Sequence, residues 1–255
     1  MATHIDTITN ANFLERSTRH RVHGVAVAVV TDNNDPDGYY RVKVRLPWLD
    51  NGGSSGGENT FWARIATIGA GKDRGVFFLP EVDDEVLVAF EHGEVSHPYV
   101  VGALWNSKQT VYQKGNGPND LRTWKSRTGH FLEFDDSGSA KVTLKTTAGH
   151  ILTLDDSGKK IECKTSDGAN HLTMDEGGSK ITMETTSGDM LIKAANKIDI
   201  EATTINVKSS ANTKMEAGGN WDTKASGNFT LKGGGTGEVN SSAVLTIKGS
   251  IVNIN

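Results

Sequence analysis

The strongest constraint on this chain is a repeat of about 20 residues near its middle. The phrases HFLEFDDSG at 130–138, HILTLDDSG at 150–158 and HLTMDEGG at 171–178 alternate apolar and polar residues before an acidic pair and a glycine. A second alternating segment follows each glycine, as at 141–144. Alternation predicts strands with one apolar face, and Asp and Gly are typical turn residues. Each repeat therefore predicts strand, acidic turn, strand and glycine turn.

Beyond residue 190 the period shortens to eight residues. Each unit has two core positions, mostly apolar and two residues apart, and a small residue two positions later. Residues two apart share one face of a strand, and a small residue suits a tight corner. The predicted core columns include Ile198, Ile200, Ile205, Val207, Met215, Trp221, Phe229, Leu231 and Val239.

In one chain, each eight-residue unit has too few apolar side chains to cover these columns. The unit offers only two apolar side chains, and its strand edges are open to solvent. Three chains wound about one axis would turn the columns inward and pair every edge. We therefore expect residues 128–255 to form a homotrimeric triangular β-helix, with long repeats over 130–189 and short repeats over 190–255. A single-chain β-solenoid is the alternative, for which eight residues is a short rung.

Residues 21–107 predict a separate β domain. The runs GVAVAVV, YYRVKVRLPWL, FWARIATIGA, GVFFLPEV and DEVLVAFEHG are β-branched or aromatic and bounded by Gly, Pro, Asp and Asn, which is typical of strands and turns. Residues 40–46 alternate between apolar and basic, so the apolar set is expected inside. Five or six strands in this length fit a small closed barrel, of which the OB-fold is one kind. Residues 1–20 would be an N-terminal arm and 108–127 a connector.

The charge pattern argues against a nucleic-acid partner. Residues 21–107 hold seven Lys/Arg against twelve Asp/Glu, and the whole chain has a formal charge of −4. A single-strand groove needs a positive track with stacking aromatic rings, whereas the basic row here is limited to Arg41, Lys43 and Arg45. The first 20 residues lack the pattern of a signal peptide. The chain is therefore expected to be made in the cytoplasm.

The acidic turns are the feature that most suggests an enzyme. Glycosidases place two carboxylates across a sugar in a cleft, whereas adjacent acids on one turn splay apart. We predict no catalytic residue, no cofactor and no metal, with calcium at the oxygen-rich turns as an alternative. His92 and His97 have no third metal ligand near them in the sequence. Cys163, the single cysteine, shares a column with Leu144 and Met183, so a buried, inert thiol is expected.

The order of motifs over 21–107 resembles the OB-fold domain of the VgrG and phage baseplate V spike family. The family pattern grVkVrfPW reads Arg41–Trp48 here, and G…f.P.vgdEVlV.F..Gd reads from Gly75 to Glu94. A closing G-x-L-x-N ends the stretch Pro98–Asn106. Asp83 departs from the pattern, because the family usually has glycine at that turn position.

The resemblance implies the central spike of a contractile injection system, either a phage tail, a phage-tail-like particle or a type VI-like apparatus. Such a spike is a trimer that sheath contraction drives into the target cell envelope, with its OB end toward the inner-tube protein and the hub. The resemblance also implies a PAAR-type tip protein at the C-terminus. We expect it to dock on Leu245, Ile247, Ile251, Val252, Ile254 and Asn255.

Two further expectations follow from this comparison. Residues 1–20 are too few for the hub domain of VgrG proteins, so a separate hub or baseplate protein is expected to contact Phe13, Leu14 and Arg16. The competing hypothesis is a β-helix that binds or degrades polysaccharide.

Overall fold

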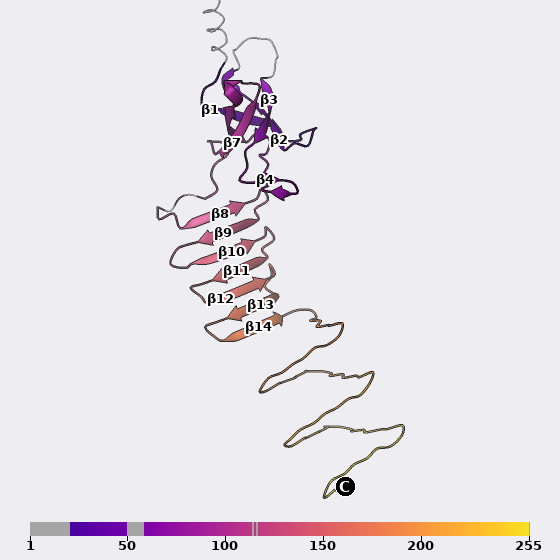
Figure 1. Ribbon diagram of the computed structural model, residues 1–255. Helices are drawn as coiled ribbons and strands as arrows, with labels where there is room; N and C mark the ends of the chain where they lie inside the picture. The colour runs from indigo at the N-terminus through magenta and orange to yellow at the C-terminus, as the bar shows by residue number, and fades with distance from the viewer. Residues whose placement is uncertain (1–20, 50–58, 114, 116, 255) are drawn as a thin grey trace, which may run out of the picture. The chain divides into compact units, whose positions relative to one another are not determined.

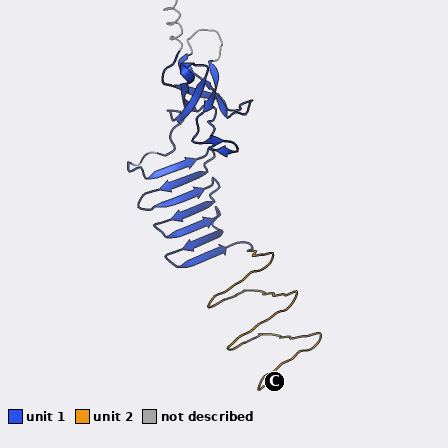
Figure 2. Cartoon of the chain, in the orientation of Figure 1, with its two compact units in different colours: residues 1–189 blue, residues 190–255 orange. Residues whose placement is uncertain are grey.

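β-Strands make up nearly all of the regular structure in this computed structural model. It describes residues 21–49, 59–113, 115 and 117–254, and within them the only helices are the 3-10 turns η1 (Pro47–Leu49) and η2 (Glu91–Gly93). The chain divides into two compact units, residues 1–189 and 190–255 (Figure 2). The predicted all-β class is confirmed.

Five strands close into a barrel in the order β1-β2-β3-β7-β6 (Figure 1). All pairs are antiparallel except β3 with β7, which is parallel. The barrel strands are β1 (Val25–Asp32), β2 (Arg41–Arg45), β3 (Thr60–Ile65), β6 (Glu85–Phe90) and β7 (Pro98–Leu104). A small separate hairpin joins β4 (Ala70–Gly71) to β5 (Arg74–Gly75). The expected OB-type barrel is therefore present.

The barrel core is built from alternate residues of these strands. Val42, Val44 and Leu46 are fully buried, and the basic residues between them lie on the outer face, as the alternation predicts. The complete core comprises Ala28, Val30, Val42, Val44, Leu46, Ala63, Val86, Val88, Phe90 and Val100. Most of these side chains are small or β-branched, which suits the narrow interior of a five-stranded barrel.

The expectation of a strand over GVFFLPEV is wrong for most of its length. Only Gly75 is in a strand, and residues 76–82 run along the surface with Phe77 and Phe78 about three-quarters exposed. Contact with the Tyr40 side chain, rather than pairing with a neighbouring strand, positions this segment. The Tyr40 and Phe77 rings lie 4.9 Å apart, and the Tyr40 hydroxyl accepts the Phe78 N–H at 2.8 Å.

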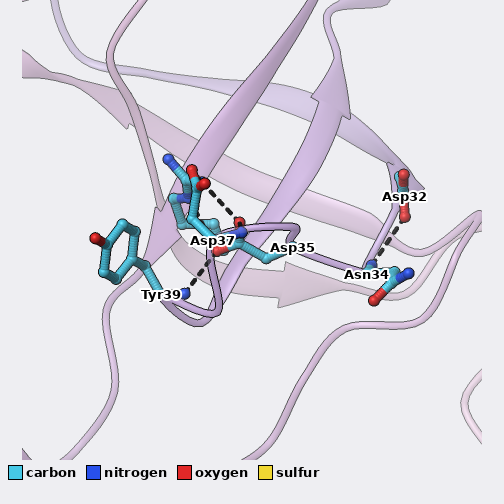
Figure 3. A network of polar contacts seen from close by, with 6 residues as sticks. Asp32, Asn34, Asp35, Asp37 and Tyr39 are labelled. Carbon is cyan, nitrogen blue, oxygen red and sulfur yellow. Dashed lines mark hydrogen bonds and ion pairs between the residues drawn. The ribbon is translucent and has the colours of Figure 1, made fainter.

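The loop between β1 and β2 is organised by a network of ion pairs and hydrogen bonds (Figure 3). The Arg41 guanidinium donates to both carboxylate oxygens of Asp35, at 2.9 and 2.6 Å, and to Asp37 at 2.6 Å. The Asp35 carboxylate also accepts the backbone N–H groups of Asp37 and Tyr39. The hydrogen bonds from Arg41 hold the pKa of Asp35 far below its ordinary range.

Seven antiparallel strands form a second sheet in strict chain order, β8 to β14 (Figure 1). They are β8 (Leu121–Lys125), β9 (Phe131–Asp135), β10 (Lys141–Lys145), β11 (Ile151–Asp155), β12 (Lys160–Lys164), β13 (Asn170–Asp175) and β14 (Lys180–Thr185). Strand β8 lies within 108–127, the range expected to be a connector, so the sheet begins earlier than the repeat indicates. The predicted strand–turn–strand units are all present.

The second unit has no strand between residues 190 and 254, but it bends at regular intervals. Bends fall at 210–211, 218–219, 226–227, 234–235, 242–243 and 250–251, a spacing of eight residues. Each bend follows the small residue that closes a short repeat, as at Ser209 and Ser241. Those two hydroxyls accept the N–H two residues on and donate to the carbonyl three residues on, which is how Ser caps a tight turn.

The Asp35–Arg41 pair predicts a specific pH dependence of barrel stability. Because the folded state lowers the Asp35 pKa, the pair stabilises the fold at pH values above the unfolded pKa of about 3.9 and loses this effect as pH falls below it. Asp35→Asn should therefore lower Tm at pH 7, and its deficit relative to wild type should shrink progressively below pH 4 in thermal melts.

Asp37→Asn is the matched control for this prediction. Asp37 has a single contact with Arg41 and an exposed side chain, so its deficit should be smaller than that of Asp35→Asn. An Asp35→Asn deficit that is the same at pH 7 and pH 3 would contradict the prediction.

Candidate functional site: the apolar face of the repeats

The seven-stranded sheet has one face made almost entirely of apolar side chains. Directly paired residues place them in two columns. The first runs across all seven strands, and the second runs across β9 to β14, since Arg122 holds its position on β8. The first contains Trp124, Leu132, Leu144, Leu152, Cys163, Leu172 and Met183, and the second Phe134, Val142, Leu154, Ile161, Met174 and Ile181. Exposure on this face reaches 72% at Trp124 and 71% at Ile181. A contiguous exposed apolar surface of this kind marks an interaction site.

The opposite face is polar apart from Phe131 and Ile151, and the charges of one of its columns alternate in sign from strand to strand. Register pairs give the column Asp135, Lys141, Asp155, Lys160, Asp175 and Lys180. Opposite charges on directly paired positions stabilise a sheet, and like charges would destabilise it. This face is therefore suited to water, which leaves the apolar face as the one that requires a partner.

The acidic turns stabilise the hairpins. Asp155 Oδ1 accepts the Gly158 N–H at 2.6 Å and the Ser157 hydroxyl at 2.9 Å. Asp175 Oδ1 accepts the Gly178 N–H at 2.8 Å, and Asp135 Oδ1 accepts the N–H of residue 137 at 3.0 Å. A Cβ on Gly158 would lie 2.7 Å from the Asp155 carboxylate, so a larger residue there would displace the side chain that caps the turn.

These hydrogen bonds lower the pKa of two of the turn carboxyl groups. Donation from Ser137 to Asp135, and from Gly158 and Ser157 to Asp155, favours the charged form in each case. A general acid needs the opposite shift. The described residues also contain no cluster of three or more His, Cys, Asp or Glu with the geometry of a metal site.

The repeated histidines join one repeat to the next. Nδ1 of His130 accepts the Thr147 N–H, and Nδ1 of His150 accepts the Ser166 N–H, each at 3.2 Å. The third copy of the phrase has Asn170 at the aligned position. There the next turn is held by a backbone bond, from the Thr186 N–H to the Ala169 carbonyl.

The predicted core residues of the second unit are all exposed in the single chain. Their exposed fractions run from 51% at Ile198 to 80% at Leu231. The chain is nevertheless extended between its bends, because residues two apart contact each other. Lys197 pairs with Asp199 at 2.8 Å, and Trp221 Nε1 donates to Thr223 at 2.8 Å. The two columns therefore share one face, but no other segment of the described chain covers that face.

The other predicted site residues lie at the ends of the chain. The proposed tip residues Leu245, Ile247, Ile251, Val252 and Ile254 are 48–87% exposed. Asn255 and the predicted hub contacts Phe13, Leu14 and Arg16 lie outside the described residues.

Two features of the site differ from the sequence analysis. The Cys163 thiol is exposed in the single chain. The expected burial is not found, because no described segment of the chain covers the apolar face. Strand β8, with Trp124, extends that face by one strand. Its alternation in LRTWK was a signal for a strand, but a single short strand outside the repeat is easily missed.

The part of the chain that matches a known protein family is the barrel. Residues 26–105 match the type VI secretion system/phage-baseplate injector OB domain. The barrel belongs to this family. No helix among the described residues has the length and apolar character needed to cross a membrane.

Three curated relatives illustrate the match. The type VI secretion system spike protein VgrG1a of Pseudomonas aeruginosa is 32% identical over 111 residues, which is 42% of this chain and 17% of VgrG1a. VgrG5 of the same organism is 34% identical over 125 residues, 41% of this chain and 16% of VgrG5. VgrG3 of Vibrio cholerae is 35% identical over 75 residues, 29% of this chain and 7% of VgrG3. The chain thus matches less than a fifth of the length of each relative.

Cys163 provides a direct test of which face of the sheet is covered. If assembly buries the apolar face, the thiol should react with a disulfide reagent such as DTNB many times more slowly in the native protein than in urea-unfolded chain. The measurement is the rate of thiol reaction, followed by absorbance, in the native protein and in the urea-unfolded chain.

The matched control moves the cysteine to the polar face. Cys163→Ala combined with Thr153→Cys should give a native protein whose thiol reacts readily, since Thr153 lies on the solvated face. Equal rates for native and unfolded wild type would show that the apolar face remains open.

Proposed function

We propose that this protein is the membrane-piercing spike of a contractile injection system, and that its repeats form a rigid homotrimeric needle. The relatives support a spike role in type VI systems or phage baseplates at the level of the family. The observation that carries the proposal is an injector OB domain followed by repeats whose apolar face is left uncovered by their own chain.

The two sets of repeats differ in how much they require from partner chains. Over 121–185 each strand already pairs with its neighbours in the same chain, so only the apolar face needs to be covered. Over 190–254 neither the face nor the strand edges have a partner in the described chain. A single-chain solenoid would pair its successive rungs within the chain. This difference supports three chains that pack through the long repeats and intertwine through the short ones.

The trimeric arrangement explains how such a needle would transmit force. Sheath contraction would push the inner tube and the spike forward together, and the spike would concentrate that force on the target envelope. Bending a wrapped β structure strains many backbone hydrogen bonds together, so a needle of this kind resists bending.

The ends of the chain are proposed to bind other proteins of the particle. At the C-terminal end, the exposed apolar residues Leu245, Ile247 and Ile254 offer a surface for a PAAR-type tip protein. At the N-terminal end, Phe13, Leu14 and Arg16 are the proposed contacts for a separate hub protein, and the inner-tube protein would lie beyond it. The assembled protein would act in a virion or tail-like particle at the target cell envelope.

The alternative of a polysaccharide-degrading β-helix has less support. Asp155 and Asp175, two of the acidic residues that would serve as catalysts, accept hydrogen bonds in hairpin turns, and the family match is to an injector OB domain. We therefore propose a mechanical rather than an enzymatic role for the repeats.

The proposed trimer predicts a defined mass. It also predicts that a charged substitution abolishes the trimer on the apolar face of the sheet but not on the polar face. Light scattering of the full chain should give three chains of 27.4 kDa, about 82 kDa. Leu144→Glu should abolish this species, because it buries an unpaired carboxylate in each of three chains at a cost of several kcal/mol.

Thr143→Lys is the control, since it adds a charge next to Leu144 but on the opposite, polar face, where Glu133 is its direct partner. It should leave the mass at three chains. A wild-type protein that is a well-behaved monomer would refute the trimer, as would a Leu144→Glu variant that retains the full mass.

The tip-docking proposal predicts the effect of a short C-terminal truncation. A chain ending at residue 243 should fail to retain a PAAR-type tip protein in a pull-down, while light scattering shows that it is still a trimer. Lys248→Ala, which changes a polar residue between Ile247 and Gly249, should retain the tip protein. Retention by the truncated trimer would show that the cap binds elsewhere.

A further inference from the structure

The outer face of the barrel contains a groove that the spike role does not use. It has a volume of about 520 Å³ and is lined by residues of β2, β3 and β7 and the segments next to them. Six of its residues carry the argument: Tyr39, Arg41, Trp62, Arg64, Glu91 and Tyr99. The residues between them in the strands, such as Val42, Ala63 and Val100, are in the core, so these side chains face outward.

One side of the groove is preorganised by the loop network. The Arg41 guanidinium lies 5.4 Å from the centre of the Tyr39 ring and 5.5 Å from the Trp62 ring. Asp35 and Asp37 hold this guanidinium, and the Asp35 carboxylate also accepts the Tyr39 N–H (Figure 3). Two aromatic rings are therefore fixed on one cation before any ligand binds.

The other side of the groove offers polar groups that lack partners. Arg64 lies directly opposite Arg41 in the β2–β3 pairing and opposite Tyr99 in the β3–β7 pairing. Within the described parts of the chain, its one interaction is with the Tyr99 ring at 5.7 Å, and the Trp62 indole N–H has no acceptor. Glu91 Oε2 accepts the Tyr99 hydroxyl at 3.0 Å, which leaves its second oxygen available.

The charges of the groove select between classes of ligand. Asp35 and Asp37 offset the charge of Arg41 from beside the groove, and Glu91 in its lining offsets that of Arg64. No excess positive charge is left to attract a polyanion. A saccharide ring has an apolar face that stacks on aromatic rings, and its hydroxyls both donate and accept hydrogen bonds. Aromatic faces, free donors and one free carboxylate oxygen match that chemistry.

We propose that this groove binds a neutral saccharide chain. Tyr39 and Trp62 form the stacking platform, Arg64 and the Trp62 indole donate to ring and hydroxyl oxygens, and Glu91 accepts from hydroxyls. Tyr39 is 72% exposed, so its ring is available to a ligand. The proposal concerns the barrel alone and does not depend on the oligomeric state of the repeats.

The test uses the full chain on a glycan array that carries neutral hexose, neutral N-acetylhexosamine and acidic oligosaccharides. The protein should bind the neutral oligosaccharides on the array. Titration calorimetry with the most strongly bound of them then gives Kd. Tyr39→Ala should weaken binding roughly five- to tenfold through loss of one stacking face, whereas Tyr39→Phe should retain it. Arg64→Gln should weaken binding without changing Tm, because Arg64 is exposed and unpaired with a carboxylate.

Trp105→Ala is the control outside the groove, since Trp105 is 69% exposed elsewhere on the protein. It should leave Kd unchanged. The proposal is overturned if the array shows no neutral glycan bound, if acidic glycans are preferred, or if Trp105→Ala weakens binding as much as Tyr39→Ala. None of these outcomes bears on the trimer, which light scattering tests separately.

Discussion

Every strand from β8 onward presents apolar side chains on one face, and the single chain leaves that face in contact with solvent. Hydrophobic burial is the main favourable term in folding, and a structure that forgoes it must recover it by association. The barrel is independent of this constraint because its core closes on itself, around residues such as Val44 and Val88. The repeats have no such internal closure. Assembly and folding are therefore one problem for the C-terminal half of the chain.

The chain meets this problem in two stages. The long repeats satisfy their backbone hydrogen bonds in cis, through tight acidic turns and an alternating column of charges on the polar face. The short repeats have neither turns long enough for hairpins nor partners in cis, and they retain only their bends. The first region can thus form a sheet in each chain before association, while in the proposed trimer the second would gain its strands from other chains. This order would let the long repeats align the chains in register before the short repeats wind.

The sequence was sufficient for the periodic parts of the fold and insufficient for the irregular ones. The alternation over 40–46 and the spacing of Gly158 and Gly178 follow from backbone geometry, and the structure agrees with them. The segment around Phe77 is apolar enough to be a strand, but its position is decided by a contact with Tyr40, 37 residues away. The groove was missed for the same reason. Tyr39 precedes β2, Trp62 lies in β3 and Tyr99 lies in β7, and only the barrel closure brings them together. Each looks locally like an ordinary strand or turn residue.

The distribution of chemistry along the chain follows from the same geometry. A binding site needs unlike groups that converge on one point, whereas a repeat places like groups in parallel columns. In the long repeats the acidic residues pair with lysines or cap turns, and their spacing is set by the rung. In the barrel, strands from distant parts of the chain cross, and Arg64 meets Tyr99 across a parallel pair that no local repeat could produce. A protein that combines one closed barrel with long repeats therefore has the barrel as the place for a small-ligand site, while its repeats suit the extended assembly proposed above.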